Sequence, residues 1–109
     1  MKYRIVLVPF PFDDFSETKV RPAVCLTEKI GKHKHIVIAF VTSQIPKDKN
    51  ETDVALEKND ETGLKVDSVL RLHRLTTIPF ELIKRQLGDI PSGKRKEVQH
   101  KLGLLFGIK

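Results

Sequence analysis

The sequence has one cysteine, few aromatic residues and no long apolar run, and each shortage excludes a class of protein. Cys25 has no partner within the 109 residues for a disulfide, which fits a reducing compartment such as the cytoplasm. No apolar run approaches the roughly 18–20 residues that a membrane-spanning helix needs, so no membrane association is expected. Aromatic residues are only 6% of the chain, so its phenylalanines are expected in the core rather than stacked on nucleic-acid bases.

Recognisable catalytic and cofactor motifs are equally scarce. The sequence has no glycine-rich phosphate loop, no Ser-His-Asp arrangement and no internal repeat. His33-Lys34-His35 has the spacing of metal ligands, but it lies in a lysine-rich turn without a nearby cysteine or acidic residue, so a solvated turn is expected. We therefore expect neither a metal ion nor a cofactor.

What the chain does have is length for one domain, expected over residues 1–109, and an excess of positive charge. The 20 Lys and Arg residues against 14 Asp and Glu give a net charge of +6. Such a charge favours a polyanion or an acidic protein as partner and says nothing about the fold.

The hydrophobic pattern predicts a mainly β protein, a small barrel or sandwich with one helix at the end of the chain. Strands are expected at residues 5–10, 20–27, 36–45, 52–57 and 67–78, and residues 82–87 fit either a strand or a helix. Pro9 and Pro11 should end the first strand, because proline lacks the N–H that a ladder uses. In the C-terminal helix Ser92 is expected as the N-cap, and the buried face is expected to carry Val98, Leu102 and Leu105.

Alternation along the two longest strands assigns their side chains to faces. In the third strand, one face is expected to carry Ile36, Ile38, Phe40, Thr42 and Gln44, and the other Val37, Ala39, Val41 and Ser43. In the strand at 67–78, one face is expected to carry Val69, Arg71, His73 and Leu75, and the other Leu70, Leu72 and Arg74.

Three polar side chains interrupt these apolar strands. Arg21 opens the second strand, Thr42 ends the third, and Arg71 lies within the strand at 67–78. Taken singly, each fits a solvated or ion-paired residue, and threonine is a good strand former. Strand ends of a small barrel converge, however, so the three side chains can share one cleft.

The contexts of these residues, taken in order, resemble the MazF/PemK family of toxins. The matching segments are Val6–Phe12 (VLVPFPF) with Asp14, Lys19–Val24 (KVRPAV), Val41–Ile45 (VTSQI), Gly63–Arg71 (GLKVDSVLR), Thr76–Ile78 and Leu82–Gly88 (LIKRQLG), followed by the C-terminal helix. They span nearly the whole chain. One departure is at the N-terminus, where Tyr3-Arg4 stands in place of the family's glycine and acidic residue.

The resemblance implies an SH3-like barrel of five to seven strands with a C-terminal helix. It also implies a homodimer that cleaves single-stranded RNA, leaves 2′,3′-cyclic phosphate and 5′-hydroxyl ends, and is neutralised by a cognate antitoxin. Operator DNA would be contacted only through the complex with that antitoxin. The family's functional positions carry over to Arg21, Thr42 and Arg71 as catalytic residues, and to Asp14, Lys19, Ser43 and Gln44 as residues that contact RNA.

The chemistry of RNA cleavage by its own 2′-hydroxyl suits these residue types. The forked, permanently charged guanidinium of Arg21 suits clamping of the phosphate, and the hydroxyl of Thr42 can position a phosphate oxygen. Arg71 fits a second clamp or an acid, although a guanidinium gives up its proton reluctantly. His73 stands where some family members have aspartate, and an imidazole, with a reference pKa of roughly 6.5, is a competent base.

Two alternatives remain open from the sequence. Toxins with the same barrel that poison DNA gyrase bind a protein and cut nothing, so the fold does not decide the activity. A non-catalytic module that binds RNA or an antitoxin is the other, favoured by Tyr3-Arg4 and by His73 in place of aspartate.

Overall fold

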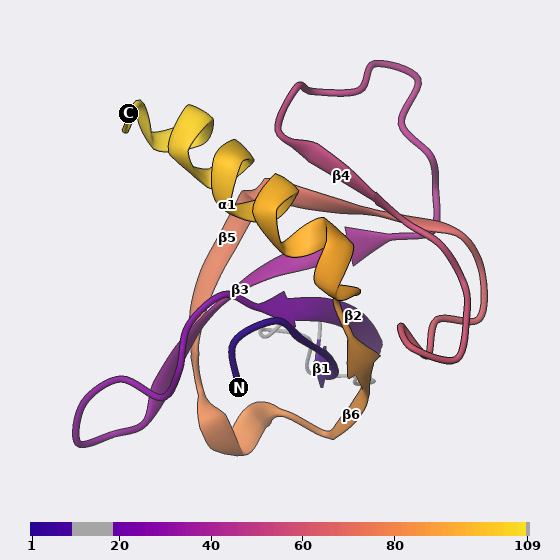
Figure 1. Ribbon diagram of the computed structural model, residues 1–109. Coiled ribbons are helices and arrows are strands. Elements are labelled where there is room, and N and C mark those ends of the chain that lie inside the picture. Colours follow the sequence, from indigo (N-terminus) through magenta and orange to yellow (C-terminus); the bar gives the residue numbers. More distant parts are fainter. Residues whose placement is uncertain (10–18, 109) are drawn as a thin grey trace.

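The computed structural model describes residues 1–9 and 19–108 of the chain and has a mainly β fold. Its elements are β1 (Arg4–Pro9), β2 (Val20–Cys25), β3 (His35–Thr42), β4 (Asp53–Leu56), β5 (Ser68–Pro79), the 3₁₀ turn η1 (Phe80–Leu82), β6 (Arg85–Asp89) and α1 (Ser92–Phe106). The strands form one curled antiparallel sheet in the order β4-β5-β3-β2-β1-β6, and α1 lies across it (Figure 1). This half-barrel with a C-terminal helix confirms the predicted fold class. No helix within the described ranges has the length and apolar character needed to cross a bilayer.

Both faces of the sheet carry buried apolar side chains, which explains the nearly continuous apolar runs in the sequence. The face under α1 holds a cluster that we call the helix-side cluster, and the opposite face holds the outer cluster. The helix-side cluster contains Tyr3, Ile5, Val24, Leu26, Ala39, Val41, Val54, Leu56, Leu64, Leu70, Leu72, Ile90 and Val98. The outer cluster contains Val6, Val8, Ala23, Cys25, Ile36, Ile38 and Ile78.

The helix contributes the side chains that its periodicity predicted. Val98 is fully buried, and Leu102 and Leu105 pack against the helix-side cluster. The expected N-cap is wrong: Pro91 occupies the N-cap position, Ser92 is the first helical residue, and no side-chain hydrogen bond caps the helix. Ser92 already has helical backbone angles. A capping residue needs an extended backbone for its side chain to reach the free N–H groups of the first turn.

Some predicted strand limits also need correction. The second and third strands end at Cys25 and Thr42, earlier than the sequence suggested. Ser43 and Gln44 therefore lie beyond β3, where the Thr42 hydroxyl bonds the backbone of Gln44 and turns the chain. The ambiguous residues 82–87 divide between the end of η1 and the start of β6.

Alternation along β5 holds only in part, because the strand is irregular. Leu70 pairs with Val41, but the next pair along the ladder joins Leu75 to Ala39, so six positions of β5 lie opposite three positions of β3. The extra residues reverse the alternation, and Leu75 packs against the helix-side cluster that contains Leu70 and Leu72. The prediction that Leu75 shares the face of Arg71 and His73 is therefore wrong.

Tyr3, directly before β1, has a backbone conformation that glycine favours. Its φ is +75°, in the left-handed region that is costly for side chains with a Cβ. The ring compensates by packing: it is 8% exposed, and its hydroxyl accepts a hydrogen bond from Gln99 Nε2 at 2.6 Å. Tyr3 thereby ties the start of β1 to α1.

The gap between the two sheet edges, β4 and β6, is closed by backbone contact with the loop after β4. Asp89 N–H donates to Glu61 O at 2.8 Å, which joins β6 to that loop. Thr62 is fully buried and organises the loop, because its hydroxyl donates to Glu57 O at 2.8 Å and accepts from backbone N–H groups. Two glycines, Gly63 and Gly88, lie where a Cβ would collide with backbone across this junction.

Cys25 is expected to resist thiol reagents in the folded protein. Its side chain is fully buried in the outer cluster, and burial raises the pKa of the thiol to about 11. At pH 8 the reactive thiolate is therefore on the order of a thousandth of the population. Ellman's reagent should leave the native chain unlabelled over minutes and label one thiol at once in 8 M urea. Rapid labelling without denaturant would contradict the burial of this side chain.

The same shift sets an alkaline limit on stability. The folded state holds the thiol proton more tightly than the unfolded state does, so this contribution is complete below pH 9. It is lost as the pH rises from about 9 to about 11, by about 1.4 kcal/mol for each pKa unit. A Cys25→Ser variant should lack this part of the alkaline decline in urea midpoints.

Candidate functional site

The register of the sheet brings Arg21 and Thr42 to one face of two neighbouring strands. Ala23 of β2 pairs with Phe40 of β3, and directly paired residues share a face. The ladder ends at this pair, and Arg21 and Thr42 each lie two residues beyond it, so alternation assigns both to the face of the outer cluster. Arg21 is exposed and Thr42 is half-buried, so a ligand on this face can reach both.

Arg71 joins the same face from the next strand. Thr42 pairs with Val69 of β5, and Arg71 follows Val69 by two residues. Arg21, Thr42 and Arg71 thus come from three neighbouring strands and are assigned to one face of the sheet. Both arginines are charged at any physiological pH, so the face presents fixed positive charge to an anion.

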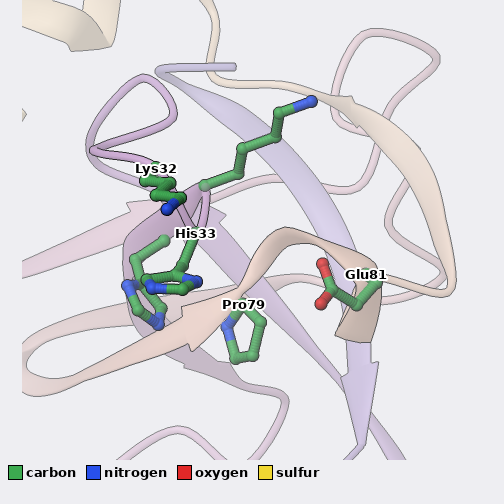
Figure 2. Close-up of a pocket in the computed structure, with 6 residues that line it drawn as sticks. Lys32, His33, Pro79 and Glu81 are labelled. Carbon is green, nitrogen blue, oxygen red and sulfur yellow. The ribbon is translucent and has the colours of Figure 1, made fainter.

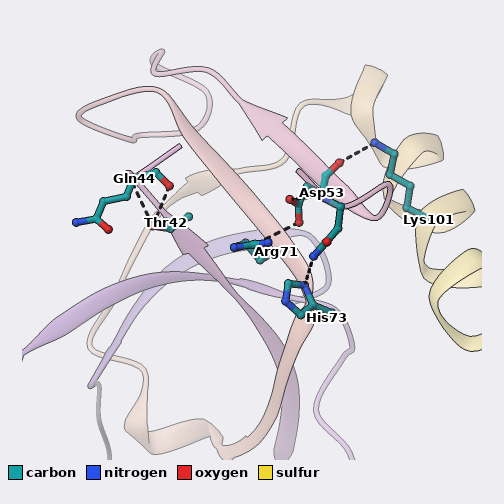
Figure 3. Close-up of polar contacts among 7 residues, drawn as sticks. Thr42, Gln44, Asp53, Arg71, His73 and Lys101 are labelled. Carbon is teal, nitrogen blue, oxygen red and sulfur yellow. Dashed lines mark hydrogen bonds and ion pairs between the residues drawn. The ribbon is translucent and has the colours of Figure 1, made fainter. Parts of the chain in front are cut away.

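A buried carboxylate holds Arg71. Arg71 Nε donates to Asp53 Oδ1 at 3.3 Å, and the Asp53 side chain is 3% exposed against 22% for Arg71. The two residues are also directly paired between β4 and β5. Figure 3 shows Arg71 reaching Asp53 across the two strands, with His73 beside them.

His73 is exposed and is linked to the same cluster through Asn50. The Asn50 side-chain nitrogen lies 3.4 Å from His73 Nδ1, and Asn50 N–H donates to Asp53 Oδ2 at 3.0 Å. Arg71 and His73 therefore belong to one hydrogen-bonded group, a link that their spacing of two residues did not by itself predict.

The hydroxyl of Thr42 is engaged with its own chain. Thr42 Oγ1 accepts from Gln44 N–H at 3.1 Å and lies 3.5 Å from Gln44 O (Figure 3). This closed turn fixes the hydroxyl at the end of β3. Ser43 points elsewhere: it lines a groove of about 290 Å³ with Leu7 and Leu64, on the side of the helix-side cluster.

The remaining expected RNA contacts lie at the start of β2 or outside the described residues. Lys19 is exposed directly before β2, two residues from Arg21. Asp14 falls within residues 10–18, outside the described part of the chain.

The two histidines of the β2–β3 hairpin lie away from this face, at the opposite ends of β2 and β3. His33 and His35 have ring centroids 6.0 Å apart and line a hollow of about 450 Å³ with Lys32, Lys34 and Glu81 (Figure 2). Within the described residues, no group of three or more His, Cys, Asp or Glu side chains has the geometry to hold a metal ion.

Sequence reasoning missed Asp53 and Asn50. The available signal was local: Asn50 and Asp53 are the first and last residues of a four-residue turn, where short polar side chains bond neighbouring backbone groups. The missing information was the pairing of β4 with β5, which sets Asp53 opposite Arg71. Lys101 of α1 was also missed, and its Nζ donates to Asp53 O at 2.7 Å.

Solved structures with this fold are bacterial toxins and their complexes. The Mycobacterium tuberculosis toxin MazF-mt6 superposes with a TM-score of 0.78 at 19% identity, over 97% of this chain and 98% of that one. MazF from Deinococcus radiodurans gives a TM-score of 0.70 at 20% identity, over 98% and 96% of the two chains. A mycobacterial endoribonuclease in complex with its cognate antitoxin gives 0.74 at 11% identity, over 100% and 96%. The architecture is thus that of MazF toxins.

The sequence carries the assignment from fold to family. Residues 1–106 match the family described as the PemK-like, MazF-like toxin of type II toxin–antitoxin systems. The chain therefore belongs to the PemK/MazF toxin family, as its motifs indicated. A sequence comparison with curated proteins finds no match.

Proposed function

We propose that the chain, as one toxin domain over residues 1–109, is a sequence-selective endoribonuclease that cleaves single-stranded RNA, mRNA in particular, without a metal ion. Membership of the PemK/MazF family supports the toxin endoribonuclease class. The observation that carries the finer proposal is the common face of Arg21, Thr42 and Arg71, with His73 joined to Arg71 through Asn50 and Asp53. The net charge of +6 favours RNA as the polyanion.

In the proposed reaction the 2′-oxygen of the RNA attacks the adjacent phosphorus and the bond from phosphorus to the 5′-oxygen breaks. His73 takes the proton of the 2′-hydroxyl. Arg21 stabilises the charge that develops on the phosphate oxygens, and Thr42 positions one of them. Arg71 faces the leaving 5′-oxygen and offsets its negative charge until that oxygen takes a proton from water, while His73 returns its own proton to the solvent. The products are a 2′,3′-cyclic phosphate and a 5′-hydroxyl.

The proposed partner is a cognate antitoxin, which would silence a cytoplasmic homodimer of this chain. Two solved structures with this fold, from a mycobacterial species and from Deinococcus radiodurans, are complexes of a toxin with its antitoxin. The positive net charge of this chain suits an acidic antitoxin segment. Operator DNA would be reached only as part of that complex. Lys19, Gln44 and Asp14 are proposed contacts to RNA, and Ser43 is a proposed contact where the RNA extends into the groove lined by Leu7 and Leu64.

The deciding experiment is incubation of the purified protein with a long single-stranded RNA in excess EDTA, followed by mapping of the ends. The expected result is a small set of discrete cuts with 5′-hydroxyl ends. His73→Ala, run beside the wild type, should lower the cleavage rate by about 10²-fold or more if the imidazole acts as base. An unchanged rate in that variant would remove His73 from the mechanism.

Intact RNA across several long substrates would reject the nuclease. Salt-dependent binding of uncleaved RNA would then identify a binding module, and inhibition of gyrase supercoiling would identify the protein-directed class of toxin.

A further inference from the structure

The turn from Asn50 to Asp53 lies behind the candidate site and contacts two of its members. Asp53 begins the edge strand β4, and its carboxylate is almost fully buried. A carboxylate leaves water only where it has hydrogen-bond donors and a counter-charge. Asp53 has both: Oδ2 accepts the backbone N–H of Asn50 at 3.0 Å, and Oδ1 accepts Nε of Arg71 at 3.3 Å.

Because Asp53 contacts Arg71 through Nε, it determines which guanidinium nitrogens can bind a phosphate. A guanidinium has five N–H donors in one plane, and four of them are on the two terminal nitrogens. Asp53 holds Nε, so the plane of the guanidinium is fixed while the terminal nitrogens remain available to a phosphate.

Asn50 orients the imidazole of His73, as Asp53 orients the guanidinium of Arg71. The Asn50 side-chain amide contacts Nδ1 of His73 at 3.4 Å. A ring nitrogen in a hydrogen bond is occupied, and the partner on Nδ1 sets both the ring orientation and the neutral tautomer. An amide nitrogen only donates, so Nδ1 accepts in this contact and the neutral ring carries its proton on Nε2. His73 thus offers Nε2–H to a substrate, and Nδ1 takes up a proton once the 2′-hydroxyl replaces Asn50 there.

The turn from Asn50 to Asp53 is also held by its own backbone and by a lysine of α1. Asp53 N–H donates to Asn50 O at 3.0 Å and closes the turn, and Lys101 Nζ of α1 donates to Asp53 O at 2.7 Å. Lys101 is in turn paired with Glu97 at 2.8 Å, one helical turn earlier. Helix, turn and β5 are thus connected through a single buried residue.

We infer that Asn50 and Asp53 are positioning residues of the proposed ribonuclease: Asp53 orients the guanidinium of Arg71, and Asn50 orients the imidazole of His73 and keeps Nδ1 as its unprotonated nitrogen. This inference rests on the proposed function for its catalytic meaning. Neither residue touches the RNA in this assignment, and each acts through the residue it holds.

The first test separates orientation from binding. Asp53→Asn keeps the size of the side chain and removes its charge. It should lower kcat for RNA cleavage by about 10- to 100-fold with little change in KM, because misplacing a reacting group by about 1 Å has effects of that size. Asp67→Asn is the matched control, since Asp67 also accepts a backbone N–H, that of Lys58 at 2.9 Å, without contact to Arg71 or His73.

The second test needs no RNA. Long-range ¹⁵N–¹H NMR spectra report which imidazole nitrogen carries the proton. His73 should show one dominant tautomer in the wild type and a more even mixture in Asn50→Ala, whereas Asn59→Ala, which removes a comparable turn-forming amide, should leave His73 unchanged.

The two tests distinguish failure of the positioning role from failure of the proposed function. Wild-type kcat in Asp53→Asn, or an unchanged tautomer ratio in Asn50→Ala, would overturn the positioning role while the nuclease remained. Absence of cleavage by the wild type would overturn the proposed function, and the NMR result would still decide whether Asn50 fixes the histidine. Unfolding midpoints of all four variants separate loss of orientation from loss of folded protein.

Discussion

Replacing Arg21 by alanine is expected to lower kcat for RNA cleavage by about 10²- to 10³-fold while the protein stays folded. The reaction builds negative charge on the phosphate oxygens, and removing one preorganised donor to such charge has an effect of this size. Arg21 is exposed at the start of β2, so its truncation leaves both apolar clusters intact. The measurement is single-turnover cleavage of an RNA that contains one mapped site.

Two further arginine variants make this prediction specific. Arg21→Lys keeps the charge and loses the planar fork, so it should recover only part of the rate. Arg4→Ala removes the same charge from the far end of the neighbouring strand β1, four residues before Val8, which pairs with Arg21. That control should cleave at close to the wild-type rate. A comparable loss in Arg4→Ala would mean that net charge, and not a clamp at Arg21, drives the reaction.

Gly63→Ala is expected to lower the free energy of unfolding by at least about 4 kcal/mol. This is the largest loss that we expect from adding a single methyl group to this chain. Two costs combine at this position. The backbone has φ +68°, which an L side chain rarely adopts, and a Cβ would collide with the backbone carbonyl of Leu87. The carbonyl belongs to β6 and cannot move without breaking the junction that closes the half-barrel. Since domains are stable by roughly 5–15 kcal/mol, the variant should be largely unfolded at 37 °C.

Two other glycines serve as controls that separate these costs. Gly31 has φ +72° but nothing within 4 Å of a built Cβ, so Gly31→Ala should lose about 1–2 kcal/mol from the backbone term alone. Gly93, in the first turn of α1, has open space and no positive φ, and Gly93→Ala should be neutral or slightly stabilising. Urea unfolding at fixed protein concentration measures all three. A Gly63→Ala midpoint equal to that of Gly31→Ala would show that the loop shifts away from β6.

The parts of the fold that sequence reasoning obtained are those set by local pattern. Alternation and apolar runs located five strands to within a few residues, because a strand buried on both faces needs continuous apolar side chains. The helical spacing of Val98, Leu102 and Leu105 identified the side of α1 that packs against the sheet. Local pattern failed at Leu75, where extra residues in β5 reverse the alternation and nothing in the sequence marks their position.

The sequence likewise indicated only part of the candidate site. Arg21, Thr42 and Arg71 were proposed from the sequence because each polar residue interrupts an apolar strand within a family motif. Asp53 and Asn50 were not identified from the sequence, because they are polar residues in a polar segment and no pattern distinguishes them from their neighbours. Their role depends on which strand lies beside β5, and that strand is β4.

By itself, the sequence determined the composition of this protein's strands and helix, its excess of positive charge and its membership of a toxin family. These follow from side-chain chemistry and from periodicity, which act over a few residues at a time. The tertiary structure alone decided which residues face one another: Ala23 beside Phe40, Arg71 against Asp53, and Gly63 against the backbone of β6. Pairing between distant strands is set by the packing of the whole sheet, and its register fixes which polar groups can act together.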